Sequence, residues 1–167
     1  MNNQRKQLCL NYLKARKAFL EEANKDDVLH GNDNIVGRIG EAIAHSFLEQ
    51  LGKKPEVVRN QSKAGYDIIC LSDNSKISVK MITSENKSGS TSQIKHEWHE
   101  LIGIELGEDL KVIKLGLITR KNFELELTKR NQRLAPNFSR AMLKETGVFA
   151  KAGKIYIGEE LAKYNLL

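Results

Sequence analysis

Three charged residues interrupt apolar segments of this 167-residue chain at positions that could support chemistry. Asp67 lies near the start of GYDIICL, Lys80 lies near the end of KISVKMI, and Glu41 interrupts the apolar pattern of GRIGEAIAHSF. Two carboxylates and an amine can together hold a divalent metal ion beside a group that positions or deprotonates water. Such a cluster forms only if the elements around these residues bring them together.

Residues 66–82 are expected to form a β-hairpin. The first arm is rich in residues that favour strands, the sequence SDNS is typical of a turn, and the second arm alternates polar and apolar residues. If Leu71 faces Lys76 across the turn, Asp67 lies directly opposite Lys80, with Cβ atoms about 4.5–5.5 Å apart. The alternative is an ordinary cross-strand ion pair on a solvated face, which contributes about 1 kcal/mol or less.

The segment before the hairpin is expected to be a helix that brings Glu41 close to it. Residues 35–52 carry apolar side chains at helical spacing, and Gly52 is a typical helix stop. Gly40 and Ala42 flank Glu41, and small residues allow another backbone to approach closely. The expected apolar side consists of Ile35, Ile39, Ala42, Ile43, Phe47 and Leu51.

The order of these motifs resembles that of the PD-(D/E)xK nuclease superfamily, which has the restriction-endonuclease-like fold. The resemblance covers residues 35–83: a Glu on a helix, then a hairpin with G-Y-D, a turn and x-V-K. It implies an α/β domain with a central mixed β-sheet flanked by helices. It also implies an endonuclease that uses Mg²⁺, with Mn²⁺ as a substitute, to hydrolyse phosphodiester bonds in DNA. A type II restriction endonuclease is one candidate.

The resemblance implies roles for five residues of this chain. Asp67 and Glu41 would bind the metal together with the backbone carbonyl of Val79. Lys80 would position water or stabilise charge on the phosphate, because a nearby carboxylate raises a lysine pKa and disfavours a role as base. Ser78 stands where the motif has a second acid, so Glu41 is expected to compensate. The alternative is a catalytically degenerate member that binds nucleic acid or a partner protein.

Positive charge is concentrated in the last third of the chain. The formal net charge is +6, yet residues 1–110 hold 15 Lys or Arg against 16 Asp or Glu, and residues 111–167 hold 12 against 5. A polyanion is a natural partner for such a region, because phosphate neutralisation releases counterions. Solubility is the alternative explanation. The candidate nucleic-acid contacts are Lys87, Lys95, Lys129, Arg130, Arg133 and Arg140.

The segment Thr128 to Arg140 is the candidate for recognition of duplex DNA. It combines Arg with Asn and Gln, which read the edges of guanine and adenine. A basic solvated loop is the alternative, and RNA or branched DNA are alternative substrates. Because one active site cuts one strand, we expect a homodimer for cleavage of both.

The rest of the sequence is expected to complete one domain over residues 1–167. It divides into an N-terminal helix at about 4–23, a catalytic core at about 35–120 and a basic segment at about 121–167. Ser84 to Gln93 contains no apolar residue and is expected to be an exposed, mobile loop. Further expected elements are an edge strand at 56–59, strands at 112–119 and 153–158, a short helix at 139–145 and a helical turn at 159–164. Segments 96–106 and 122–127 are compatible with helix or strand.

The sequence HEWHE at 96–100 is not a zinc-protease motif, because its histidines are three residues apart rather than four. Either His96 or His99 is a candidate phosphate contact, with ordinary surface histidines as the alternative. Trp98 is expected in the core. Both cysteines, Cys9 and Cys70, are expected to be reduced and buried. No apolar run reaches the length of a membrane span, so we expect a cytoplasmic protein with no membrane partner.

Overall fold

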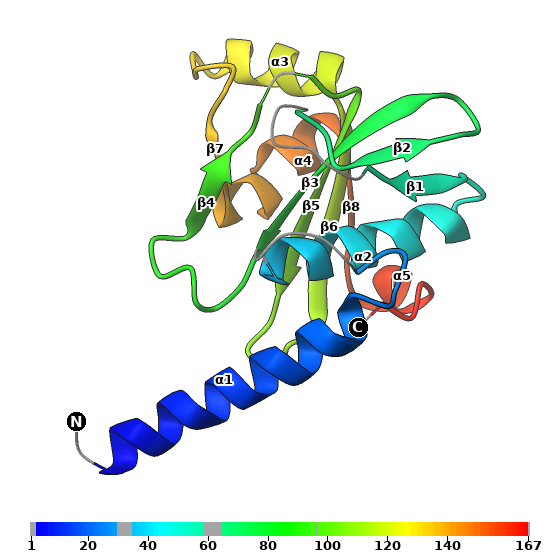
Figure 1. The fold of residues 1–167 in the computed structure, drawn as a ribbon. Helices are drawn as coiled ribbons and strands as arrows, with labels where there is room; N and C mark the ends of the chain where they lie inside the picture. The colour runs from blue at the N-terminus through cyan, green and yellow to red at the C-terminus, as the bar shows by residue number, and fades with distance from the viewer. Residues whose placement is uncertain (1–2, 30–34, 59–64, 96, 167) are drawn as a thin grey trace.

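A mixed six-stranded β-sheet forms the centre of the fold (Figure 1). The computed structural model describes residues 3–29, 35–58, 65–95 and 97–166. In spatial order the strands are β1 Pro55–Val57, β2 Ile68–Cys70, β3 Ser75–Ile82, β5 Glu100–Leu106, β6 Val112–Thr119 and β8 Lys154–Tyr156. Strands β3 and β5 run parallel, and the other neighbouring pairs of this sheet are antiparallel. The expected α/β class with a central mixed sheet flanked by helices is confirmed.

Two hydrophobic cores cover the two faces of this sheet. On one face, α2 (Ile35–Gln50) and α5 (Gly158–Ala162) pack through residues such as Phe47 and Leu161. On the other face, α3 (Arg120–Lys129), α4 (Val148–Ala152) and a 3₁₀ helix (Arg140–Leu143) pack through Phe123 and Phe149. The close fit depends on Gly116 in β6, where an added Cβ would lie 2.5 Å from Cδ1 of Phe149.

Strand β3 contributes to both cores because successive side chains point to opposite faces. Ile77, Val79 and Met81 belong to the core beneath α2, whereas Ile82 belongs to the core beneath α3 and α4. The even-numbered residues, Lys80 among them, therefore project away from α2.

Helix α2 begins at Ile35 and ends two residues before Gly52, which has the left-handed φ of 76° that suits glycine. Its buried face is rotated from the expected one: Ala44 and Leu48 are buried, whereas Leu51 is exposed. The buried side also contains Arg38, a residue that an apolar pattern does not select.

The N-terminal helix α1 (Asn3–Ala23) confirms the helix expected at about 4–23. Figure 1 shows it running away from the sheet, with its N-terminal end remote from the other elements. At the opposite end, Ala23 is buried and Phe19 and Leu20 are half-buried. The side chain of Cys9 lies outside the described part of the structure, whereas Cys70 is buried as expected.

The segment expected to be a mobile loop at 84–93 ends in a strand, β4 (Ser90–Gln93). It pairs with β7 (Asn137–Ser139) in a small second sheet, so this expectation is wrong for residues 90–93. Residues 90–93 form a strand without apolar side chains because their backbone pairs with that of β7. The next residue, Ile94, is buried in the core.

The other elements of the second half follow the expectations with changes in detail. Residues 100–106 form a strand, and residues 122–127 lie in α3, which Thr119 caps by accepting the N–H of Asn122. The strand at 112–119 is confirmed, and the strand expected at 153–158 is present over Lys154–Tyr156. The helix expected at 139–145 is a short 3₁₀ helix. Trp98 is a core residue as expected and packs edge-on against Phe123 at 5.6 Å. None of the described helices combines the length and apolar character required to cross a bilayer.

Candidate active site

The expected cluster lies along one side of β3, beyond the point where β2 ends. Strand β2 has three residues and β3 has eight, and β2 pairs with β3 only as far as Ile68 opposite Ile77. We call the side of β3 that faces β2, over residues 78–82, the β3 edge. The structure describes no strand paired with this edge.

Asp67 gives the β3 edge a side-chain partner in place of a strand. Its Oδ2 atom accepts the backbone N–H of Val79 at 2.6 Å and is 3.4 Å from the hydroxyl of Ser78, which donates to it. Its own N–H donates to the carbonyl of Ile77 at 2.8 Å. The carboxylate is therefore held in one orientation against β3.

The register of the hairpin differs from the expected one by two residues. Because Ile69 pairs with Lys76, continuation of the ladder sets Asp67 opposite Ser78 rather than opposite Lys80. The turn has the expected length of four residues but begins one residue earlier, at Leu71. Asn74 adopts a left-handed φ of 56°, and the Asp73 side chain accepts the N–H of Ser75. An even shift keeps Asp67 and Lys80 on the same face, so they remain diagonal neighbours.

The carbonyl of Val79 also points to the β3 edge. In an antiparallel arrangement, the N–H and C=O of one residue point to the same side of the strand. Since the N–H of Val79 meets Asp67, its carbonyl faces the same region. This direction agrees with the expectation that Val79 contributes a backbone oxygen to the site.

Glu41 approaches the β3 edge from the other face of the sheet. Helix α2 packs directly on β3 at Gly40, where an added Cβ would lie 3.0 Å from Cβ of Met81. This contact confirms the expected close approach beside Glu41. Because Lys80 projects from the opposite face, Glu41 and Lys80 can influence each other only around the edge of β3.

Electrostatic interactions connect the three expected residues. The pKa of Glu41 is raised from 4.5 to about 7, chiefly by burial and next by the charge of Asp67, with Arg38 and Lys80 opposing the rise. Burial also raises the pKa of Asp67, against the opposing effects of the Val79 N–H and Lys80. The two acids thus lie close enough to repel each other, and a cation between them would relieve that repulsion.

Lys80 carries a lowered pKa, contrary to the expected rise beside carboxylates. Burial is the largest cause and outweighs the attraction of Asp67 and Glu41, while Lys95 lowers the pKa further. The Nζ atom donates to Oγ of Ser92 on β4 at 3.2 Å. Within the described residues, Lys80 forms no ion pair with either acid.

Two further residues, Arg38 and Ser92, contribute to this site and were not expected from the sequence. Arg38 precedes Glu41 by three residues on α2, and that helical spacing is the signal that could have identified it. Ser92 lies in a run of polar residues with no distinguishing pattern. Only the fold brings Ser92 to Lys80.

The candidate nucleic-acid contacts fall into two groups. Lys87, Lys95, Lys129 and Arg133 are exposed. Arg130 is half-buried and forms an ion pair with Glu126 at 2.7 Å.

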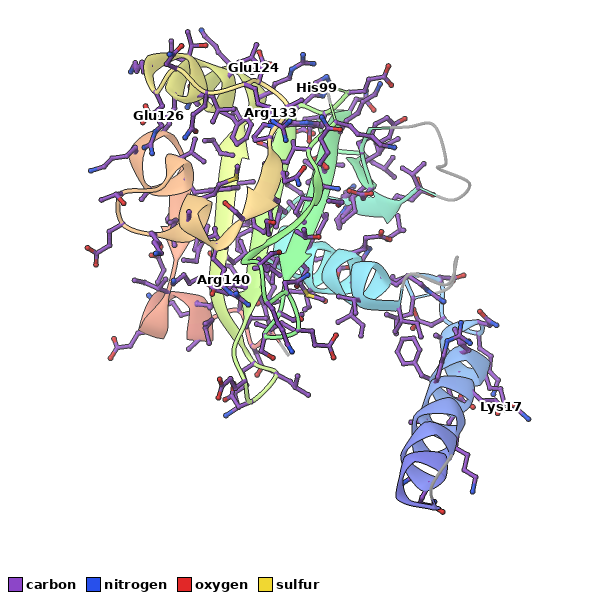
Figure 2. The ribbon with its side chains drawn as sticks, turned by 90° about the vertical axis from the view of Figure 1, so that its left-hand side faces the viewer. Lys17, His99, Glu124, Glu126, Arg133 and Arg140 are labelled. Atoms are coloured by element: carbon purple, nitrogen blue, oxygen red, sulfur yellow. The ribbon has the colours of Figure 1, made fainter. Side chains whose placement is uncertain are left out.

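Arg140 is the second of the group that binds other parts of the protein. Its guanidinium forms an ion pair with buried Glu105 at 3.3 Å and donates to the carbonyls of Thr83 and Asn86. In Figure 2, Arg140 lies well below Arg133, which is at the same end of the domain as His99. Arg140 therefore fixes the start of the 3₁₀ helix against the loop after β3.

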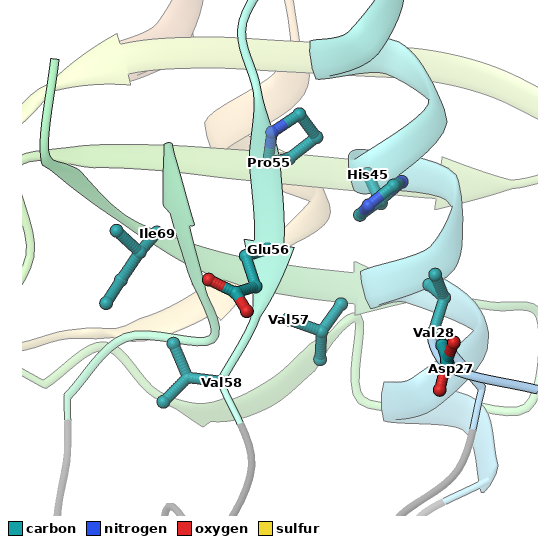
Figure 3. Close-up of a pocket in the computed structure, with 8 residues that line it drawn as sticks. All are labelled: Asp27, Val28, His45, Pro55, Glu56, Val57, Val58 and Ile69. Carbon is teal, nitrogen blue, oxygen red and sulfur yellow. The ribbon is translucent and has the colours of Figure 1, made fainter. Parts of the chain in front are cut away.

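His99 also makes a structural contact, since its Nδ1 atom accepts the backbone N–H of Lys76 at 3.1 Å. His96 lies outside the described residues. A separate pocket of about 590 Å³ lies beside the outer strand β1, and its polar lining includes Asp27, His45 and Glu56 (Figure 3). None of the expected site residues lines this pocket.

The donor set can be compared with the needs of a metal ion. Across the residues that the structure describes, no group of three or more His, Cys, Asp or Glu side chains is arranged to hold one. The β3 edge offers two carboxylates and one carbonyl. Hard oxygen donors of this kind suit Mg²⁺, which usually keeps several waters and binds through one or two carboxylates.

Comparison of the chain with protein-family models and with curated proteins gives no match.

Proposed function

We propose that this protein is a divalent-metal-dependent endonuclease that hydrolyses phosphodiester bonds in DNA. The observation that carries the proposal is the convergence of Glu41, Asp67 and Lys80 at the β3 edge from α2, from the residue before β2 and from β3. Half-buried acids with raised pKa values beside a lysine are costly for stability, and such arrangements are frequent at functional sites. The PD-(D/E)xK-like order of these residues supports the same reaction.

Mg²⁺, or Mn²⁺ in its place, would be held by the carboxylates of Glu41 and Asp67 and the carbonyl of Val79. When bound, the ion would supply a Lewis acid that polarises the phosphate and lowers the pKa of water. Full binding requires Glu41 to lose the proton that its pKa of about 7 favours, so affinity should rise with pH.

The residues of the chain perform the remaining tasks. Val79 and Ser78 hold the Asp67 carboxylate in place through hydrogen bonds. The ammonium of Lys80 positions water and stabilises the negative charge that develops on the phosphate oxygens. Lys95, which lies within electrostatic range of Asp67 and Lys80, adds positive charge on the side of β4.

The favoured substrate is duplex DNA, bound with contributions from the exposed residues Lys87, Lys95, Lys129 and Arg133. A cytoplasmic homodimer would place one site on each strand, as in a type II restriction endonuclease. Single-stranded, branched and RNA substrates provide the comparison: preferential cleavage of a branched or RNA substrate would reassign the substrate but keep the reaction.

Cleavage assays with Mg²⁺ or Mn²⁺ test the proposal. We expect Asp67→Ala, Lys80→Ala and Glu41→Ala each to abolish cleavage of duplex DNA, while circular dichroism shows a folded protein. Glu49→Ala is the matched control, because Glu49 is an exposed acid on the same helix. Equal cleavage by the parent and all three site variants would show that the site is wrongly assigned.

Ser78 favours a second candidate function, a nucleic-acid-binding protein that does not cut. This buried hydroxyl occupies the position of the missing acid and donates to Asp67. That candidate predicts no uptake of Mg²⁺ in calorimetry and a DNA affinity that EDTA leaves unchanged. Metal uptake that disappears in Asp67→Ala would exclude it.

A further inference from the structure

The hydrogen bond between Lys80 and Ser92 involves a strand that the proposed chemistry has not used. Ser92 lies on β4, outside the central sheet, and its hydroxyl is 3.2 Å from Nζ of Lys80. A lysine ammonium is a compact charge on a flexible stem. At a partly buried site it would be drawn to the carboxylate of Asp67, yet no ion pair joins the two in the described structure.

Strand β4 is fixed firmly enough to hold this lysine. At its end, the N–H of Ile94 donates to the carbonyl of Pro136 at 2.9 Å, and Nε2 of Gln93 donates to the carbonyl of Ala135 at 3.0 Å. At its start, the N–H of Arg140 donates to the carbonyl of Gly89 at 3.0 Å.

Arg140, which binds the residue before β4, also connects β4 to the central sheet. The guanidinium of Arg140 contacts Glu105 of the central sheet and the carbonyls that follow β3. The start of β4 is thereby attached, through Arg140, to β5 and to the loop that follows β3.

We propose that Ser92 is a positioning residue that keeps the Lys80 ammonium away from Asp67. The ammonium then remains available to a phosphate. This inference rests on the proposed nuclease function. It also gives the small second sheet a role in the active site.

Kinetics of Ser92→Ala test the role in catalysis. We expect kcat to fall by about 10-fold to 100-fold, as for a misplaced catalytic group, with KM for DNA unchanged. Ser92→Thr, which keeps the hydroxyl, should restore most of the rate. Ser90→Ala is the matched control, because Ser90 lies on the same strand and its hydroxyl is 3.3 Å from that of Ser88.

A second measurement does not depend on catalysis. Crystal structures of the parent and of Ser92→Ala should show Nζ of Lys80 moving into an ion pair with Asp67 in the variant. Calorimetry should show weaker Mn²⁺ binding by that variant, because the ammonium then competes for the carboxylate.

The possible outcomes separate the two hypotheses. An unmoved Lys80 in the Ser92→Ala crystal structure, or an unchanged kcat in an active protein, overturns the role of Ser92. A parent protein that cuts no phosphodiester substrate overturns the nuclease function, and the position of Lys80 in the variant still decides what Ser92 does.

Discussion

Replacement of Glu41 by Gln is expected to stabilise the metal-free protein at pH 8 while abolishing cleavage. The carboxylate is half-buried and its pKa of about 7 lies above its usual 4.5. Ionisation of Glu41 therefore costs folding free energy. Gln has nearly the same size and hydrogen-bonding reach but carries no charge, so it removes this cost.

The sign and size of the effect follow from the two pKa values. Between pH 4.5 and about 7, the folded protein holds a proton on Glu41 that the unfolded chain has lost. The free energy of unfolding contributed by this group therefore falls as pH rises through that window and stays low above it. The difference between 4.5 and about 7, at about 1.4 kcal/mol for each pKa unit, gives an upper value of about 3–4 kcal/mol.

Urea denaturation of the parent and Glu41→Gln in EDTA at pH 5, 6, 7 and 8 measures this directly. We expect the variant to gain stability relative to the parent across the series, with the largest gain at pH 8. Glu49→Gln, which changes an exposed acid on the same helix, is the matched control for the loss of a negative charge. A pH-independent difference, or a parent that is the more stable protein at pH 8, would refute the reasoning.

Four further outcomes are expected. Arg140→Ala should lower the free energy of unfolding by about 2 kcal/mol, because buried Glu105 loses an ion-pair partner, and DNA affinity measured by fluorescence anisotropy should not change. The double variant Lys129→Ala, Arg133→Ala should weaken DNA binding and reduce the slope of log Kd against log salt by about 2. Gly116→Ala should cost about 2 kcal/mol or more in urea denaturation, because its Cβ would overlap the ring of Phe149. Mg²⁺ should raise the melting temperature more at pH 8 than at pH 6, because metal binding competes with protonation.

Local patterns in the sequence predicted the hairpin, α2 and the approach of Glu41 to Asp67 and Lys80. These features depend on residues that lie within about 40 positions of one another in the chain. They also depend on the alternation of polar and apolar residues along the strand, and on the small size of Gly40. The register was wrong because the four-residue turn begins at Leu71 rather than at Ser72, and residue types alone do not fix where such a turn begins.

Long-range contacts could not be predicted in the same way. The polar segment of β4 forms a strand because β7, more than 40 residues later, supplies its partner. Arg140 is as basic as its neighbours in the sequence, and only the fold reveals that Glu105 binds it. A charge pattern therefore identified the basic region, but it could not separate structural arginines from exposed ones.

The hydrogen bond from Val79 to Asp67 has a consequence for solubility. The side of a strand that lacks a neighbouring strand is a template on which a second molecule can add its own strand and begin to aggregate. An acceptor side chain on this N–H opposes that addition. The acid that would bind the metal thus also discourages self-association along β3.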